Sequence, residues 1–199
     1  MNINFAKSAL IEIDVQNDFC PGGSLAVTEG DAVVEPLNEW ARRFAAAGAP
    51  VIATQDWHPA GHCSFLPAGR TPRDGGTLWP DHCVQGTPGA DFHPALDTRP
   101  VTLILRKGFR PGMDSYSAFF ENDRATATGL APYLRSIGVD TLYLGGLATD
   151  YCVYYSCMDA IRQGFAVCLL ADAIRGVGYP EGSVEAALEA MKTAGAKMV

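Results

Sequence analysis

Hydrophobic positions along the chain alternate between two kinds of segment. Short apolar runs, typical of buried strands, are followed by longer segments in which apolar residues recur at helical spacing. The runs predict strands over residues 9–15, 50–54, 101–107, 140–147 and 165–171, with a last edge strand at 197–199. The helical spacing predicts helices over residues 31–47, 128–137, 152–163 and 184–194, each followed by a glycine that favours a stop.

Strands that alternate with helices imply right-handed crossover connections and a mostly parallel sheet covered on both faces. One connection does not follow this alternation of strands and helices. Residues 55–99, about 45 in number, show little periodicity, and they carry all four histidines and two of the three tryptophans. Long irregular connections are usually functional or disordered, and the histidines favour function. With no repeat or linker in view, we expect one domain over residues 1–199.

Three reactive side chains fall at or just beyond the ends of predicted strands. Asp14 lies near the end of the first strand, Lys107 ends the third and Cys152 follows the fourth. Ligands of open parallel sheets sit outside the carboxyl ends of the strands, so these three residues are expected at one edge. A carboxylate there could take the proton of a thiol, and an ammonium group would favour both charged forms.

Cys152 is predicted at the start of a helix, after a turn that begins with two glycines. Free backbone N–H groups and the helix dipole at such a position would lower the cysteine pKa, and the same amides could hold an oxyanion. Taken singly, each residue has a plainer interpretation: a small buried cysteine, a loop-capping aspartate, a solvated lysine. Their shared placement favours a catalytic site.

A second group of candidate functional residues lies in the irregular connection, residues 55–99. Asp56 and His58 follow the second strand, and His62 or His82 can close the set from the loop. One carboxylate with imidazoles is a ligand set for a divalent transition metal, and open coordination positions would make the site catalytic or substrate-binding. The alternative is a polar loop whose histidines cap turns. His93 lies outside the cluster and is interpreted as structural.

Composition narrows the class of protein. Hydrophobic residues make up 48% of the chain and charged residues 19%, as in ordinary globular proteins. The net charge of −7 argues against nucleic acid or an anionic membrane surface as a partner. No apolar run approaches the ~20 residues of a membrane span, and the N-terminus lacks a signal-peptide layout, so a cytoplasmic location is predicted. Six cysteines without a CxxC pair are expected to be free thiols.

Several motifs together resemble the nicotinamidase/pyrazinamidase family, within the isochorismatase-like cysteine hydrolases. The resemblance extends from about residue 9 to about residue 190 and is carried by residues 13–19 (IDVQNDF), 56–59 (DWHP), 79–87 (WPDHCVQGT), 107–108 (KG) and 146–153 (GLATDYCV). It implies an α/β fold, a three-layer α/β/α sandwich around a parallel six-stranded sheet. It also implies hydrolysis of nicotinamide to nicotinate and ammonia, a step of NAD salvage, with pyrazinamide accepted as an analogue.

The resemblance assigns roles to particular residues. Cys152 matches the nucleophile, Asp14 the acid/base and Lys107 the third member of the triad. The amides of Ala148 and Cys152 match an oxyanion hole, with a cis peptide bond before Ala148.

The resemblance also implies one divalent metal ion per chain, which receives the pyridine nitrogen of the substrate: zinc, with iron or manganese as alternatives. Its implied ligands are Asp56, His58 and His82, with His62 a fourth ligand in some members. Aromatic walls of the substrate site match Phe19, Trp79 and Tyr116. The expected partner is the small-molecule substrate, and the chain is expected to be a monomer or small homo-oligomer.

Other functions compete with this interpretation. A different amidohydrolase of the same superfamily would have no use for the metal cluster, and isochorismatase proper lacks the nucleophilic thiol. A non-enzymatic metal-binding or thiol redox protein would need no role for Asp14 or Lys107. A conventional zinc hydrolase would use metal-bound water as its nucleophile and would keep most activity without Cys152.

Overall fold

The computed structural model describes residues 3–66 and 77–199. In strand order, its six-stranded parallel sheet consists of β3 (Val101–Lys107), β2 (Val51–Asp56), β1 (Ser8–Ile13), β4 (Thr141–Leu147), β5 (Ala166–Arg175) and β6 (Lys197–Met198). The α-helices are α1 (Val34–Ala46), α2 (Leu130–Ser136), α3 (Tyr154–Arg162) and α4 (Ser183–Thr193). Within the described residues, no helix is long and apolar enough to cross a membrane.

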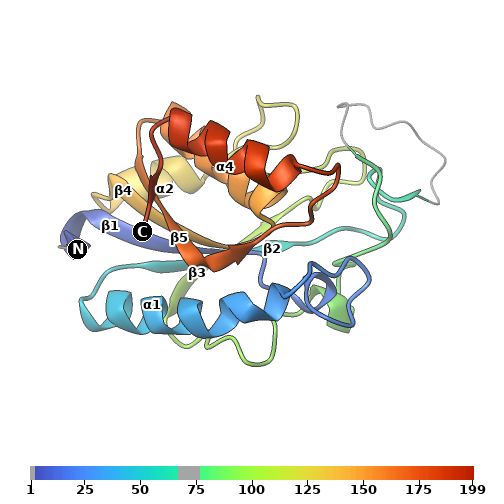
Figure 1. Cartoon of the computed structure of the whole chain (residues 1–199), viewed down its shortest axis with the longest axis horizontal. Coiled ribbons are helices and arrows are strands. Elements are labelled where there is room, and N and C mark those ends of the chain that lie inside the picture. Colours follow the sequence, from blue (N-terminus) through green and yellow to red (C-terminus); the bar gives the residue numbers. More distant parts are fainter. Residues whose placement is uncertain (1–2, 67–76) are drawn as a thin grey trace.

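Helices cover both faces of the sheet, which confirms the predicted three-layer sandwich (Figure 1). On one face α1 buries Leu37 and Phe44, which lie on a single apolar stripe and are fully buried. On the other face α2, α3 and α4 contribute Leu134, Cys157 and Met191 to a second cluster, and these side chains are also fully buried. The sheet is therefore the shared wall of two apolar cores.

Burial along the strands follows their place in the sheet. Every side chain of β1 and β2 is buried, as expected for central strands covered on both faces. β3 lies at one edge, and its side chains alternate between half-buried and exposed until Lys107, which is buried. The change at Lys107 marks where the edge strand enters the candidate site.

Most predicted boundaries differ from the structure by one to three residues, and two other differences have a specific structural cause. The strand predicted over 165–171 continues as β5 to Arg175, because β5 bulges past the exposed residue Asp172 and then pairs again with β4. Cys152 was expected in the first turn of an α-helix and instead lies in a π-helical turn, Thr149–Val153, that leads into α3. Such wide turns are frequent at functional sites, and hydrophobic periodicity does not distinguish them from α-helix.

Gly146 allows β1 and β4 to approach closely at the end that carries the reactive residues. It pairs with Ile13, the last residue of β1, and has a φ of +121°. A Cβ atom built on Gly146 would lie 2.0 Å from the carbonyl oxygen of Ile13. No side chain fits there without moving one of the strands, so glycine is required at this position.

Glu12 is a buried carboxyl group on the α1 side of β1. Its side chain is about 1% exposed, and neither of its oxygens has a hydrogen-bond partner within residues 3–66 and 77–199. Burial raises the pKa of Glu12 to about 8, and the negative charge of Asp97 adds to the effect. The protonated, neutral form is therefore the one that the fold accommodates.

The raised pKa of Glu12 predicts a pH-dependent stability. The stabilisation associated with this group is complete below its ordinary pKa of 4.5 and is lost as the pH rises towards about 8. In urea unfolding between pH 5 and 8, the parent should lose up to about 1.4 kcal/mol per pH unit relative to Glu12→Gln. Glu39→Gln, on the exposed side of α1, is the control. Parallel pH profiles for the parent and Glu12→Gln would contradict the prediction.

Candidate active site

The predicted reactive residues meet at the carboxyl ends of four neighbouring strands. Lys107 ends β3, Asp56 ends β2, Asp14 directly follows β1, and Cys152 lies in the turn after β4. The chain runs outward from β1 to β3 and then returns to β4 on the other side of β1, so the winding direction changes between β1 and β4. Open α/β sheets place their ligands at such a switch point.

Lys107 is the residue that joins the others. Its Nζ lies 2.8 Å from Oδ2 of Asp14 and 3.4 Å from Sγ of Cys152, and it also contacts Oδ1 of Asp56. It donates a further hydrogen bond of 2.9 Å to the backbone oxygen of Ser115. Lys107 is only about 1% exposed, so protein groups and not water surround its ammonium group.

The two carboxylates keep Lys107 charged inside the protein. Burial by itself lowers the pKa of Lys107, but the charges of Asp14 and Asp56 outweigh it, and the pKa is raised well above its ordinary value. For Asp56, burial alone would raise the pKa. The Lys107 ammonium group and His58 outweigh burial, and the pKa of Asp56 lies well below its ordinary value. Asp56 is therefore a permanent carboxylate next to a permanent cation.

The electrostatics of Cys152 differ from the expectation. The helix-terminal amides were predicted to lower its pKa, but burial raises the pKa well above the ordinary value, with Lys107 opposing and the carboxylates of Asp14 and Asp56 adding to the rise. Burial also raises the pKa of Asp14, although Lys107 opposes it. The resting nucleophile is thus a thiol, which needs a base for activation, and the adjacent Asp14 is placed to be that base.

Asp56, His58 and His82 form a group whose donor atoms all lie within 4.8 Å of one another. Nδ1 of His58 donates a 2.8 Å hydrogen bond to the backbone oxygen of Gly108, and Nδ1 of His82 donates one of 2.7 Å to that of Pro80. A carbonyl oxygen can only accept, so each imidazole carries a proton on Nδ1, and in its neutral form the Nε2 atom is the one that can bind a metal ion. This arrangement is the usual one for metal-ligating histidines, so the residues fit a divalent metal ion.

His82 also has the protonation state that a ligand needs. Burial lowers the pKa of His82 to about 4, and the neighbouring His58 contributes to the lowering. At neutral pH its imidazole is therefore uncharged, with an electron pair available.

His62 lies next to this group with different partners. Its Nδ1 is 2.7 Å from the hydroxyl oxygen of Ser64, and its Nε2 donates a 3.1 Å hydrogen bond to the backbone oxygen of Met113. The ring stacks on His58, with 4.3 Å between ring centroids. Both nitrogens of His62 are thus engaged away from the Asp56–His58–His82 group, and its role as a fourth ligand stays a prediction.

A small pocket opens directly onto the thiol and the metal-ligand group. Phe19, Trp79 and Tyr116, predicted as aromatic walls, all line it. Nε1 of Trp79 donates a 3.0 Å hydrogen bond to the Tyr116 hydroxyl and so fixes the two rings relative to each other. An apolar, mostly aromatic pocket with a few polar groups at one end suits a flat aromatic ligand.

Three further residues line this pocket and were not predicted. Tyr151 directly precedes the nucleophile, and Val177 lies just beyond the carboxyl end of β5, so position relative to the sheet could have indicated both. Leu25 belongs to the loop after β1, and no signal in its sequence context distinguishes it.

The peptide bond between Leu147 and Ala148 is cis, as the resemblance implied. Ala148 lines the pocket beside Cys152, and its carbonyl oxygen accepts hydrogen bonds from the amides of Tyr151 and Val153, at 3.0 and 3.1 Å. These bonds shape the turn that carries the nucleophile. The amides of Ala148 and Cys152 stay the predicted oxyanion hole.

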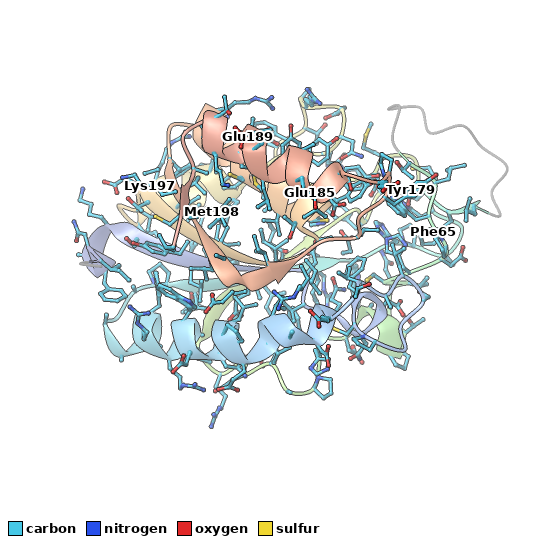
Figure 2. The ribbon with its side chains drawn as sticks, viewed as in Figure 1. Phe65, Tyr179, Glu185, Glu189, Lys197 and Met198 are labelled. Carbon is cyan, nitrogen blue, oxygen red and sulfur yellow. The ribbon has the colours of Figure 1, made fainter. Side chains whose placement is uncertain are left out.

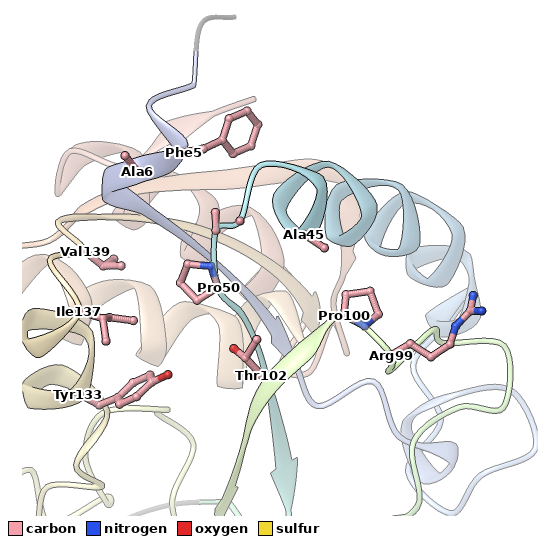
Figure 3. Close-up of a pocket in the computed structure, with 12 residues that line it drawn as sticks. Phe5, Ala6, Ala45, Pro50, Arg99, Pro100, Thr102, Tyr133, Ile137 and Val139 are labelled. Carbon is pink, nitrogen blue, oxygen red and sulfur yellow. The ribbon is translucent and has the colours of Figure 1, made fainter.

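The site and the amino ends of the strands lie at opposite ends of the molecule. Phe65 and Tyr179, from loops far apart in the sequence, lie towards the end opposite to Lys197 and Met198 (Figure 2). A second, open pocket of about 570 Å³ lies at the amino ends, between the end of α1, the start of β3 and Tyr133 of α2 (Figure 3). None of the predicted site residues lines it.

The chain belongs to the isochorismatase domain family, whose family model matches residues 8–199. Among characterised relatives, it is 45% identical over 199 residues to the nicotinamidase of Escherichia coli (strain K12), with 96% of this chain and 93% of that protein covered.

Solved structures agree in fold and in sequence. The pyrazinamidase of Pyrococcus horikoshii in complex with zinc is 44% identical, with a TM-score of 0.81 over 97% of this chain and 98% of that one. PnC1 from L. infantum in complex with nicotinate is 38% identical, with a TM-score of 0.88 over 100% of this chain and 95% of that one.

Proposed function

We propose that this protein is a nicotinamidase, which hydrolyses nicotinamide to nicotinate and ammonia with Cys152 as the nucleophile. The observation that carries the proposal is the contact of Lys107 with both Asp14 and the Cys152 sulfur, beside an aromatic pocket that Cys152 lines. The similarity to nicotinamidases over nearly the whole chain supports the substrate.

The pocket suits a pyridine ring that carries a carboxamide. Phe19 and Trp79 offer aromatic surface to the ring, while Cys152 lies at the pocket wall where the carboxamide would reach it. Asp56, His58 and His82 would hold a divalent metal ion, zinc in the first instance and iron or manganese as alternatives. When bound, that ion supplies an electron-pair acceptor for the pyridine nitrogen.

The chemistry follows from the positions of Asp14, Lys107 and Cys152. Asp14 takes the proton of the Cys152 thiol, and the thiolate attacks the carboxamide carbon. The amides of Ala148 and Cys152 donate hydrogen bonds to the oxyanion that forms, and such a donor contributes on the order of 3 kcal/mol in other acyl transfers.

Collapse of the tetrahedral intermediate completes the first half of the reaction. The carbon–nitrogen bond breaks, Asp14 returns its proton to the leaving nitrogen, and ammonia departs from a thioester on Cys152. Asp14, again ionised, takes a proton from water as the water oxygen attacks the thioester. The carbon–sulfur bond then breaks, Asp14 returns this proton to the sulfur, and the product acid loses its own proton to solvent and leaves as nicotinate. Lys107 stays charged throughout and favours the ionised states of Asp14 and Cys152.

Nicotinamide and benzamide provide a direct test, because they differ only in the ring nitrogen. The zinc-loaded protein should release ammonia from nicotinamide with a kcat/KM at least tenfold above that for benzamide, and should also accept pyrazinamide. Absence of ammonia release from nicotinamide by the folded, metal-loaded protein would refute the assignment. The cytoplasmic location, the single domain and the monomeric or small homo-oligomeric state are predictions that this test does not address.

Removal of a predicted metal ligand tests the metal site separately. His82→Ala should reduce the bound zinc, measured by elemental analysis after dialysis, from about one ion per chain to less than a tenth of that. His93→Ala, which changes a histidine outside the ligand group, should retain the ion. Equal zinc contents in the two variants would contradict the assignment of His82.

A further inference from the structure

Thr54 holds Asp14 through two hydrogen bonds to a single hydroxyl group. It lies on β2, is fully buried, and is placed two residues before Asp56. Its Oγ1 accepts a 3.1 Å hydrogen bond from the backbone N–H of Asp14 and donates one of 2.6 Å to Oδ1 of the same residue. The hydroxyl thus bridges the main chain and the side chain of the predicted base.

The backbone of Asp14 explains why such a bridge is present. Asp14 leaves the sheet with a φ of +49°, in the left-handed region that residues with a side chain seldom adopt. The regular pairing of β1 with β2 ends two residues earlier, at Glu12 and Ala53. The N–H of Asp14 would be buried without a partner here, and the Thr54 hydroxyl satisfies it.

The two carboxylate oxygens of Asp14 consequently have different surroundings. Because the Thr54 hydroxyl has one proton and donates it to Oδ1, that oxygen is held as an acceptor. Oδ2 lies 2.8 Å from Nζ of Lys107 but makes no well-directed hydrogen bond within the described residues. Oδ2 is therefore the oxygen left to receive a proton, and the Lys107 ammonium group that it contacts also contacts the Cys152 sulfur.

We infer that Thr54 is a positioning residue that fixes the Asp14 carboxylate with Oδ1 engaged and Oδ2 turned to the nucleophile, so that Oδ2 carries the transferred proton. The inference rests on the proposed function, since it concerns the base of that reaction. Thr54 does not line the pocket, so it acts through Asp14 and has no contact with the ring.

A pair of variants isolates the hydroxyl. Thr54→Ser and Thr54→Ala both lack the γ-methyl group and differ only in the oxygen atom. We expect Thr54→Ala to lower kcat for nicotinamide by about 10–100-fold with KM changed less than threefold, because a misplaced base slows the chemical step and not binding. Thr54→Ser should recover kcat to within about threefold of the parent. Thr102→Val, which removes a hydroxyl bonded to a backbone oxygen elsewhere in the sheet, is the control and should match the parent.

The outcomes separate this inference from the proposed function. Turnover by the parent supports the function whatever the variants do. Equal kcat values for Thr54→Ser and Thr54→Ala, or a loss that appears in KM alone, would overturn the role of Thr54. Should Thr54→Ala not fold, the kcat of Thr54→Ser decides: a loss of more than tenfold at unchanged zinc content would also overturn it.

Discussion

Replacement of Cys152 by alanine should lower ammonia release from nicotinamide by at least about 10⁴-fold and leave the bound metal in place. The size of the effect follows from acyl-transfer enzymes, where removal of the nucleophile costs about 10⁴ to 10⁶ in kcat. The metal should remain because its predicted ligands, Asp56, His58 and His82, form a group that does not include the sulfur. Ammonia release and zinc content, measured on the same preparation, check both statements.

The same variant distinguishes the thiol mechanism from its main rival. A conventional zinc hydrolase, whose nucleophile is metal-bound water, would keep most of its activity in Cys152→Ala. Cys168→Ala is the matched control, because Cys168 is a buried free thiol on β5, away from the pocket. Residual turnover above about a tenth of the parent in Cys152→Ala would assign the reaction to a different nucleophile.

Replacement of Lys107 by methionine should destabilise the protein by about 3–5 kcal/mol, besides abolishing activity. The expectation rests on the two buried carboxyl groups that remain in the variant. Asp14 is fully buried and Asp56 is about 4% exposed, and both lose the cation that compensates their charge. Methionine preserves most of the length and volume of lysine, so the cavity contribution is small. Urea unfolding at pH 7 measures the loss.

The exposed Lys192 of α4 provides the comparison. Lys192→Met should change the free energy of unfolding by less than about 0.5 kcal/mol. The loss in Lys107→Met should shrink at pH 4, because burial raises the pKa of Asp14 and, with Lys107 no longer opposing burial, protonation of this carboxyl group in the variant removes a buried charge. A loss equal to that of Lys192→Met at both pH values would show that the ion pairs do not stabilise the fold.

Periodicity along the chain predicted most of the architecture, and its failures have local causes. The strands and helices follow from apolar spacing, since both faces of the sheet are covered. The continuation of β5 beyond residue 171 was missed because Asp172, exposed at a bulge, interrupts the apolar run. The π-helical turn around Cys152 was missed because one extra residue in a turn leaves the spacing of Val153 and the residues after it compatible with an α-helix.

Strand ends predicted the convergence of Asp14, Lys107 and Cys152, but not their electrostatics. The pKa of the thiol depends on how completely distant segments bury it, and burial outweighs the helix amides that the local sequence suggests. The hydrogen bond that engages Nε2 of His62 goes to the backbone oxygen of Met113, some 50 residues away along the chain. Thr54 has no motif of its own, because its importance arises only from its neighbour on β1.

The absence of a side chain at Gly146 also has a consequence for how the two reacting groups are spaced. With Ile13 against bare backbone, the segments that continue into Asp14 and Cys152 leave the sheet only one strand spacing apart. The distance between the base and the nucleophile is thereby set by the hydrogen-bonded spacing of β1 and β4. It is set independently of the irregular connection that supplies the histidines, and Asp56, at the end of β2, links the two groups because it contacts Lys107.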